Sequence, residues 1–301
     1  RAWAAVRRAA MEHRPRVALL VDAPDFNLPL ARALAAQGTR VVFYVGPQVW
    51  AWRAGRLGLL AKRTDVVALV LPFELPLYER AGVKASFVGH PLLDEPAAAP
   101  SAATRASLGM GADDTIVALL PGSRRAEVKL LGGPVIAAAR ELAKRGLHPV
   151  FSPGPGAADK GMFEAAHDAG CGVLPGRLAT RDLLAAADVA LVASGTATLE
   201  AALAGVPTAV AYRMDPVSWA AARLLVRTSF VALPNLVAGR RVVPELLQGE
   251  ATGPSLAKAA LGLLNPWERK RQQEGFAKVR GLLGGPGAAS RVWRLVEERL
   301  T

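Results

Sequence analysis

The sequence predicts an α/β protein with two doubly wound, parallel-sheet domains in tandem. Three observations support this fold class. Short apolar runs of strand length alternate with segments of helical length along most of the 301 residues. Such nearly continuous apolar strands are typical of parallel sheets that helices cover on both faces. The alternation stops once, in the Ala-, Pro- and Ser-rich segment 94–114, which has the composition of a linker with one short helix.

The first half of the chain opens with a helix and continues with strands and helices in alternation. The helix that follows the first strand stops at Gly38, a residue typical of helix C-termini. The next predicted helix is basic. The predicted strands are 16–22, 40–47, 65–72 and 85–91, and the predicted helices between them are 27–38, 53–63 and 73–82.

The second half repeats this alternation. We place an N-terminal domain at 1–98, a linker at 99–112, a second domain at 113–285 and a C-terminal helix at 286–301 that packs back on the first domain. Ligands of such folds bind at the carboxyl ends of the strands, so we expect the site in a cleft between the domains. The predicted strands are 115–124, 148–154, 172–176, 189–195, 207–213 and 230–235, and the chain from Val243 onward is predicted to be helical.

The composition narrows the classes of function. A net charge of +12 and a pI of about 10.6 favour anionic partners such as nucleic acid, anionic lipid or phosphorylated substrates, although an Arg-rich solvated surface explains the charge equally well. The single Cys171 excludes a disulfide framework and a multi-cysteine metal site. The chain contains no apolar run of 18 residues, so no membrane span is predicted.

The start of the chain, "RAWAAVRRAAMEHRPRVALLVD", lacks an initiator Met. Its opening helix already has an apolar face, as a helix has when it docks on an earlier segment. We therefore expect that an N-terminal segment is missing and that the first sheet is incomplete.

The segment "ALLPGSRRAEV" (118–128) combines a strand, a tight turn and the start of a helix. Gly122 allows close approach to the backbone, the N–H groups around Ser123 point along the helix N-terminus, and Arg124 can clamp a phosphate. The segment is not a Walker A motif. The alternative is an ordinary strand–helix turn with Ser123 as the N-cap.

The segment "VALVASGTATLEAALAGVP" (189–207) repeats this design. A strand ends at Ser194, Gly195 and Thr196, and Thr198 adds a second hydroxyl. Glu200 lies four residues after Thr196 on the same helical face, where a carboxylate can accept the two hydroxyls of a ribose. The alternative is a capped helix whose glutamate favours the helix dipole. Two such turns in one domain favour a nucleotide site.

The loop "YVGPQVWAWRAGR" (44–56) is unusually aromatic and basic. Trp50 and Trp52, with Arg53 and Arg56, suggest an acceptor platform or a lipid-facing belt. A local aromatic cluster that closes the domain is an equally good interpretation.

Three further residues are weaker candidates. His90 ends a strand just before the linker, where a structural hydrogen bond is commoner than catalysis. Arg213 precedes a predicted helix. Asn235 follows a proline in a loop and is either a buried asparagine beside a phosphate turn or a simple turn residue. The other histidines lack metal-ligand spacing, so no metal site is predicted.

The strand "RVALLVD" ends in Asp22, and a second aspartate, Asp25, follows a proline. A carboxylate at a strand end in a predicted cleft suits a general base. We expect Asp25 to cap the next helix or to orient Asp22. Two neighbouring carboxylates would also raise the pKa of one of them, as a base that works near neutrality requires.

Eight motifs occur in a fixed order between residues 16 and 250. They resemble those of the lipid-A-disaccharide synthases, glycosyltransferases of the GT-B double-Rossmann fold. The resemblance implies transfer from UDP-2,3-diacylglucosamine to 2,3-diacylglucosamine 1-phosphate (lipid X), which gives the β-1,6-linked disaccharide 1-phosphate and UDP. The motifs are "DAPDFN", "PQVWAWR", "PFE…YE", "FVGHPLLD", "LLPGSR…E", "SGTATLE", "YRM" and "LPNL…G".

The resemblance also assigns roles. It implies that Asp22 is the general base of an inverting reaction, that Arg124 binds phosphate, and that Glu200 and Asn235 line the UDP side. No metal or other cofactor is expected, since helix N-termini and arginine can stabilise the leaving diphosphate. The expected partners are the two lipid substrates and the cytoplasmic face of the inner membrane, contacted peripherally; a homodimer is compatible with the sequence, and nucleic acid is not expected.

Two alternatives stay open at the level of the sequence. The first is another UDP-sugar enzyme of the same fold, either the lipid-linked N-acetylglucosaminyltransferase of peptidoglycan synthesis or a UDP-sugar epimerase. The second is an inactive, truncated nucleotide-binding remnant, because a Gly-rich strand–turn–helix resembling "GEASGD" that opens the family's chain is absent before Arg1.

Overall fold

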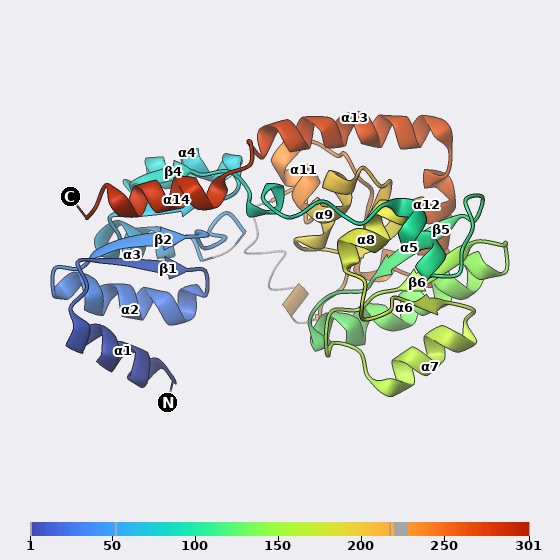
Figure 1. The fold of residues 1–301 in the computed structure, drawn as a ribbon, viewed down its shortest axis with the longest axis horizontal. Coiled ribbons are helices and arrows are strands. Elements are labelled where there is room, and N and C mark those ends of the chain that lie inside the picture. Colours follow the sequence, from blue (N-terminus) through green and yellow to red (C-terminus); the bar gives the residue numbers. More distant parts are fainter. Residues whose placement is uncertain (1, 52, 217, 220–227, 301) are drawn as a thin grey trace. The chain divides into compact units, whose positions relative to one another are not determined.

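The computed structural model describes residues 2–51, 53–216, 218–219 and 228–300 of the chain. These residues form two compact units (Figure 1). Unit 1 is built from Arg1–Glu95 and Gly281–Thr301, and unit 2 from most of the chain between them.

Unit 1 carries, within the residues described, a four-stranded sheet of order β1-β2-β3-β4. All neighbouring strands are parallel, and the register pairs Val17 with Arg40 at one end of β1 and Val21 with Tyr44 at the other. The elements are α1 (Ala2–His13), β1 (Val17–Val21), α2 (Pro24–Ala36), β2 (Arg40–Tyr44), α3 (Arg56–Arg63), β3 (Val66–Leu69), η1 (Pro72–Glu74), α4 (Leu75–Arg80), β4 (Ala85–Phe87), η2 (Pro91–Leu93) and α14 (Ala288–Glu297).

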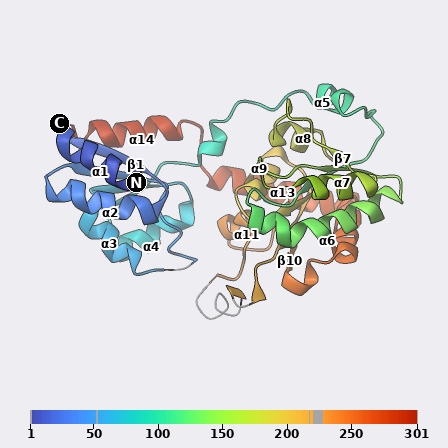
Figure 2. The same ribbon diagram turned by 90° about the horizontal axis from the view of Figure 1, so that it is seen from below.

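Helices cover both faces of this sheet, as the apolar strands require. On one face, Phe43 of β2 packs with Leu34 of α2 and Leu60 of α3 in a single buried cluster. On the other face, Val292 and Val296 of α14 pack against the sheet. Helix α1 lies beside α2, as Figures 1 and 2 show. The carboxyl ends of β1 and β2 lead into the turns that carry the predicted acceptor-side residues.

Unit 2 contains, among the residues described, a six-stranded parallel sheet of order β10-β9-β8-β5-β6-β7. Its elements are α5 (Ser101–Ser107), β5 (Ile116–Leu120), α6 (Arg125–Ala143), β6 (His148–Phe151), α7 (Lys160–Asp168), β7 (Gly172–Val173), α8 (Thr180–Ala186), β8 (Val189–Ala193), α9 (Ala197–Ala204), β9 (Thr208–Tyr212), α11 (Leu233–Ala238), β10 (Glu245–Leu247), η3 (Gln248–Glu250), α12 (Gly253–Leu263) and most of α13 (Pro266–Leu282).

The strand order of unit 2 reverses between β5 and β8. From β5 the chain proceeds outward through β6 and β7, and it then returns to the other side of β5 with β8, β9 and β10. The helices α6 and α12 pack on one face of the sheet and α8 and α9 on the other. A doubly wound sheet binds its ligand beyond the carboxyl ends of the strands at such a reversal. The turns after β5 and β8 flank this point.

The α/β class with parallel sheets is confirmed, and two details of the prediction are wrong. Residues 230–235 were predicted as a strand, but α11 starts at Leu233, with Pro234 in its first turn, where a proline suits a helix. The chain after Val243 was predicted to be helical throughout, but Glu245–Leu247 forms β10 and pairs with β9. The helix predicted after Arg213 falls largely outside the described residues. No helix in the described part of the chain is long and apolar enough to cross a membrane.

Candidate functional site

Asp22 lies directly after β1, in a turn with an unusual backbone. Both Asp22 (φ 48°) and Ala23 (φ 42°) adopt left-handed conformations, which are uncommon for residues other than glycine. The N–H of Asp22 donates to the carbonyl of Tyr44 at 2.8 Å and so extends the pairing of β1 with β2. The Asp22 side chain is exposed. The turn therefore presents a carboxylate to solvent at the carboxyl edge of the sheet.

Asn27, a residue that the sequence analysis did not single out, holds this turn. Its side chain is buried, and its Nδ2 donates to the carbonyl of Asp22 at 2.7 Å and to that of Val21 at 2.9 Å. Two hydrogen bonds from one amide fix the last strand residue and the first turn residue together. Because backbone strain persists only where its surroundings enforce it, Asn27 explains how Asp22 keeps a positive φ.

Asp25 does not cap the next helix, contrary to expectation. Ala23 occupies the N-cap position of α2 and makes no side-chain cap, while Asp25 lies in the first turn. Its carboxylate pairs instead with Arg53, at 3.2 Å, and with Arg56. The structure thus brings three predicted site residues together, and Asp25 connects the turn after β1 to the loop after β2.

Trp50 belongs to that loop and is held from two sides. Its Nε1 donates to the buried carboxyl of Glu74 at 2.9 Å, and its ring meets that of Phe73 edge-on, with 5.4 Å between the centroids. This is the local cluster that the sequence left open as an alternative to an acceptor platform. The predicted site residue Trp52 lies outside the described residues.

His90 is buried, and its Nδ1 accepts the N–H of Leu92 at 3.2 Å at the start of η2. Burial lowers the pKa of His90 to about 4. The imidazole is therefore neutral near pH 7, and its Nδ1 lone pair is already used. These contacts favour the structural interpretation of His90.

The turn after β5 is closed by a glutamate of its own helix. Oε2 of Glu127 accepts the N–H groups of Ser123 and Arg124 at 3.1 and 3.2 Å, and its Oε1 accepts from the Arg124 guanidinium at 2.8 Å. Gly122 (φ 126°) is required here, because an added Cβ would lie 2.6 Å from Oε2 of Glu127. Ser123 is not the N-cap, since Arg124 occupies that position. The Arg124 side chain is 80% exposed and so accessible to an anion.

The turn after β8 exposes Gly195 (φ 141°) and Thr196. The hydroxyl of Ser194 donates to the carbonyl of Val231 at 2.8 Å. Thr198 does not supply a free hydroxyl as expected, because its side chain is buried and its Oγ1 donates to the carbonyl of Gly195 at 2.6 Å. Glu200 lies half-buried in the first turn of α9.

The carboxyl end of β9 carries Tyr212 and Arg213. Burial and the negative charge of Glu127 raise the pKa of Tyr212, whereas the positive charge of Arg124 lowers it. Because Glu127 and Arg124 close the turn after β5, the carboxyl end of β9 lies near that turn. Nε of Arg213 donates to the carbonyl of Gln248 at 2.9 Å. Gln248 also exchanges two hydrogen bonds with the backbone of Met214, at 3.1 and 3.2 Å.

Asn235 has no capacity left for a ligand. Its side chain is fully buried; Nδ2 donates to Val243 O and Glu245 Oε1, and Oδ1 accepts the N–H groups of Val242 and Val243, at 2.6 to 3.0 Å. These four bonds are all that a side-chain amide can make. Glu245 in turn accepts the N–H groups of Val231 and Ala232. Asn235 therefore ties α11 to β10, and its expected place on the UDP side stays a prediction.

The site residues that sequence reasoning missed are therefore mostly partners of the predicted ones. Glu74 and Glu127 occurred inside the motifs without a role, while Asn27, Glu245 and Gln248 carried no signal beyond their polar character.

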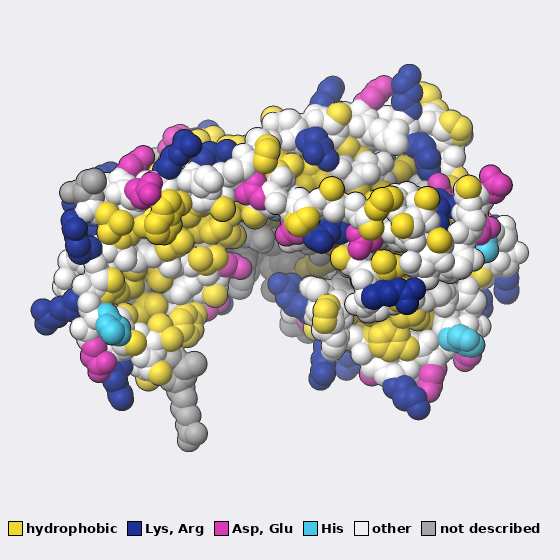
Figure 3. Space-filling model, in the orientation of Figure 1, with side chains coloured by type: hydrophobic (Ala, Val, Ile, Leu, Met, Phe, Trp, Pro, Cys, Tyr) yellow, Lys and Arg dark blue, Asp and Glu magenta, His cyan; other side chains and the backbone are white. Residues whose placement is uncertain are grey.

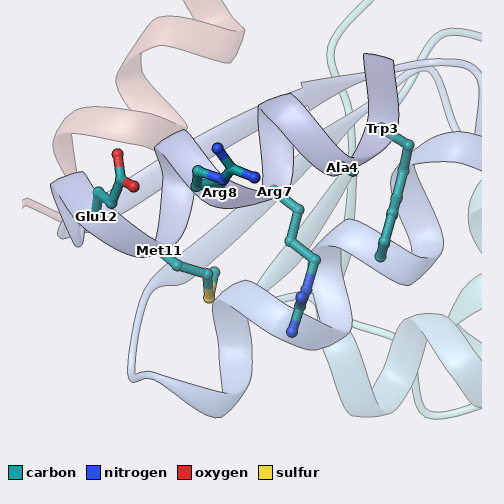
Figure 4. Close-up of a pocket in the computed structure, with 6 residues that line it drawn as sticks. All are labelled: Trp3, Ala4, Arg7, Arg8, Met11 and Glu12. Carbon is teal, nitrogen blue, oxygen red and sulfur yellow. The ribbon is translucent and has the colours of Figure 1, made fainter. Parts of the chain in front are cut away.

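A separate open pocket of about 470 Å³ lies on α1 between Trp3 and Met11 (Figure 4). It contains none of the predicted site residues.

The two parallel-sheet α/β units have the GT-B fold. The calicheamicin glycosyltransferase has this fold: its structure superposes with a TM-score of 0.61 at 19% identity, over 99% of this chain and 76% of that chain. Identity at this level shows similarity of fold alone.

The sequence comparisons define the family. The family model described as lipid-A-disaccharide synthetase matches residues 2–285. Lipid-A-disaccharide synthase of Anaeromyxobacter sp. (strain K) is 45% identical over 95% of this chain and 76% of its own length. That of Syntrophus aciditrophicus is 45% identical over 92% and 74%. The chain belongs to the lipid-A-disaccharide synthase family, which confirms the resemblance and the expected class of enzyme: a glycosyltransferase that forms the lipid A disaccharide.

Proposed function

We propose that this enzyme transfers the sugar of UDP-2,3-diacylglucosamine to the 6-hydroxyl of 2,3-diacylglucosamine 1-phosphate, with inversion and with Asp22 as the general base. The acceptor oxygen attacks the anomeric carbon of the donor, its proton passes to Asp22, and the bond from that carbon to the diphosphate breaks. The products are the β-1,6-linked disaccharide 1-phosphate and UDP.

The observation that carries this proposal is the turn after β1. It presents an exposed carboxylate in a left-handed backbone conformation that Asn27 enforces. A strained residue that its surroundings hold in place is a feature of functional sites. Asp25 is less suited to the role of base because it is engaged by Arg53 and Arg56. His90 is less suited because it is buried and uses Nδ1 for Leu92.

We assign the UDP side to unit 2. The turns after β5 and β8 flank the reversal of strand order, where a doubly wound sheet binds nucleotides. Arg124 is the cation for the diphosphate, and Gly122, Ser123, Ser194, Gly195 and Thr196 form the turns around it. Glu200 is the candidate for the ribose hydroxyls, and Arg213 lies at the end of β9. The leaving UDP is then stabilised by the Arg124 guanidinium.

The test is a transfer assay with both acylated substrates that follows UDP release by wild type and Asp22→Asn, with UDP binding measured separately by calorimetry. We expect Asp22→Asn to bind UDP normally and to lose at least about 100-fold in kcat, as removal of a general base does. Asp25→Asn is the matched control and should lose less. If Asp22→Asn retains most of the rate, the base is another group. If wild type binds UDP but releases none with these substrates, the proposed substrates are wrong.

We also propose a peripheral attachment to the cytoplasmic face of the inner membrane. Figure 3 shows hydrophobic side chains gathered over the part of unit 1 that Figure 1 labels α14 and β2. On α14, Trp293 is an exposed apolar residue, and the exposed Arg294 follows it in the sequence. Apolar side chains beside cations suit a surface of anionic lipid.

The charged segments 53–63 and 267–280 supply the electrostatic part of this attachment. Co-sedimentation with vesicles of anionic and of neutral lipid, at low and high salt, tests it. We expect binding to anionic vesicles that is lost at high salt. Binding that does not depend on salt or lipid charge would contradict the electrostatic contribution.

A further inference from the structure

Glu74 is a buried carboxyl that the proposed mechanism does not use. It ends η1 and is only 1% exposed. Oε1 accepts the indole N–H of Trp50 at 2.9 Å, and Oε2 accepts the N–H of Leu71 at 3.3 Å. Glutamate is almost never fully buried unless its charge or its hydrogen-bonding groups are satisfied. Its contact with Trp50 therefore points to a role in the loop after β2.

That loop is fixed to the sheet and to α4 at further points. Tyr78 is buried and donates its hydroxyl to the carbonyl of Pro47 at 2.7 Å. An added Cβ at Gly46 would lie 2.6 Å from the Tyr78 hydroxyl and 2.7 Å from Cδ2 of Leu69, so this segment lies directly against α4 and β3. Phe73, the neighbour of Glu74, packs against the Trp50 ring.

The loop begins and ends in strained backbone. Val45 has φ 62° and Arg53 has φ 54°, and a positive φ is especially unfavourable for a β-branched residue such as Val45. Such conformations persist only when surrounding contacts enforce them, and they gather at functional sites. The contacts of Tyr78 and Glu74 lie between these two strained residues and hold the loop there.

The far end of the loop reaches the turn that carries the proposed base. Arg53 and Arg56 pair with the carboxylate of Asp25, three residues after Asp22. A shift of the loop would therefore move the arginines that brace this turn. Glu74 thus contacts Trp50 in the first part of the segment after β2, and Arg53 and Arg56, which follow in the same segment of chain, contact Asp25.

We propose that Glu74 is a positioning residue of the acceptor side: it holds Trp50, and with it the described part of the loop after β2, in the conformation from which Arg53 and Arg56 brace the Asp22 turn. The inference rests on the proposed role of Asp22. Glu74 acts through Trp50 and takes no proton from the substrate.

The charge state of Glu74 provides a readout that does not depend on activity. Burial raises the pKa of Glu74 to about 8, and its hydrogen bonds with Trp50 and Leu71 oppose this shift. The titratable group that faces it is Tyr78 on α4, whose pKa is raised by burial and by Glu74. Glu74 is thus mainly protonated at pH 7 and ionises as the pH rises through 8, while it contacts the Trp50 indole.

The first experiment follows this ionisation in Trp50 fluorescence. The difference between the emission of wild type and of Trp50→Phe, recorded from pH 6 to 10, isolates the signal of Trp50. We expect a transition with a midpoint near pH 8 that is absent in Glu74→Gln and retained in Glu79→Gln, which changes an exposed glutamate on α4. A transition that persists in Glu74→Gln would show that a group other than Glu74 controls Trp50.

The second experiment measures transfer kinetics for Glu74→Ala, Glu74→Gln, Trp50→Phe and the double variant Glu74→Ala/Trp50→Phe. We expect Glu74→Ala to lower kcat/KM for the acceptor by about tenfold or more, since small displacements near the reacting groups are costly, with the donor KM unchanged. Glu74→Gln retains an acceptor for the indole N–H and should restore most of the rate. The double variant should lose no more than the worse single variant, because the two residues act through one contact.

Full activity of Glu74→Ala, or losses that multiply in the double variant, would overturn the proposal. If Glu74→Ala does not fold, the transfer kinetics of Trp50→Phe alone test the proposal, since this variant removes the same hydrogen bond. If wild type transfers nothing to the acylated acceptor, the proposed function fails. The fluorescence titration uses no substrate and still reports on the contact, so the two failures are distinguishable.

Discussion

The side-chain amide of Asn27 donates to the backbone carbonyl of Asp22 at 2.7 Å and holds that residue in a left-handed conformation. This single contact connects the first turn of α2 with the end of β1. Asn27 is buried and Asp22 is exposed. Through this contact, a buried side chain of unit 1 fixes the backbone that carries an accessible carboxylate. The direction of the Asp22 side chain thus depends on a residue that touches no substrate in the proposed mechanism.

The first prediction concerns this contact. Asn27→Ala removes both hydrogen bonds and releases the strained turn, so we expect kcat to fall by about 10- to 100-fold, with UDP affinity unchanged. Asn27→Asp keeps the size of the side chain but removes the amide donor, so the kcat of this variant should fall by a similar factor. Calorimetry with UDP and the transfer assay separate the two effects. Equal activity of Asn27→Ala and wild type would mean that the turn holds its shape without this amide.

The second prediction concerns the turn after β5. Arg124 is exposed and lies beside two backbone N–H groups at the start of α6. Removal of its charge by Arg124→Ala should weaken UDP binding by about tenfold or more, as expected for a charge-assisted contact to phosphate. Arg145→Ala, in the turn just after the C-terminus of the same helix, is the matched control and should bind UDP like wild type. Equal UDP affinity for both variants would place the diphosphate elsewhere.

Much of the fold could be predicted from the sequence because the strands are continuous apolar runs. "VVAL" and "VALVA" have few plausible places other than the interior of a covered parallel sheet. The errors occurred where an apolar run was short. "FVALPN" resembled a strand, but a proline in first-turn position favours a helix there. The three residues of β10 gave no periodic signal, and only their pairing with β9 makes them a strand.

The candidate site was predictable to the level of turns but not of contacts. Polar residues at strand ends identified the turns of Asp22, Arg124 and Thr196, because the carboxyl ends of parallel strands lie at one edge of a sheet. Their partners are set by tertiary packing. Glu74 reaches Trp50 across 24 residues of sequence. No local sequence pattern predicts such a pair, and none predicts the four hydrogen bonds that Asn235 makes with residues 242–245.

The third prediction tests the structural role of Asn235. Asn235→Ala would leave the buried N–H groups of Val242 and Val243 without their acceptor and Glu245 without one of its donors. We expect a loss of about 2–4 kcal/mol in the free energy of unfolding, the cost of several unsatisfied buried groups. Chemical denaturation measures this loss. Gln273→Ala, on the exposed side of α13, should change stability by less than about 0.5 kcal/mol.

If Asn235→Ala instead kept its stability and lost only UDP affinity, the amide would act on the ligand. The four hydrogen bonds found for Asn235 argue against that outcome, because a buried amide with no remaining donor or acceptor has nothing to offer a nucleotide.

The fourth prediction uses the titration of His90. Burial lowers its pKa to about 4 in the folded protein, whereas an unfolded histidine titrates near 6.5. The unfolded chain therefore binds the proton first. The stability that the neutral imidazole contributes is fully present above pH 6.5 and is lost as the pH falls toward 4. The shift corresponds to about 3 kcal/mol over that interval.

His90→Asn keeps a side-chain acceptor for the N–H of Leu92 and removes the titration, because asparagine is a good N-cap residue. The difference in unfolding free energy between wild type and His90→Asn, measured by urea denaturation from pH 7.5 to 4.5, should therefore shift in favour of the variant as the pH falls. His167→Gln, at an exposed position of α7, should show no such pH-dependent difference from wild type. A pH-independent difference for His90→Asn would mean that the imidazole becomes charged without cost, which its burial opposes.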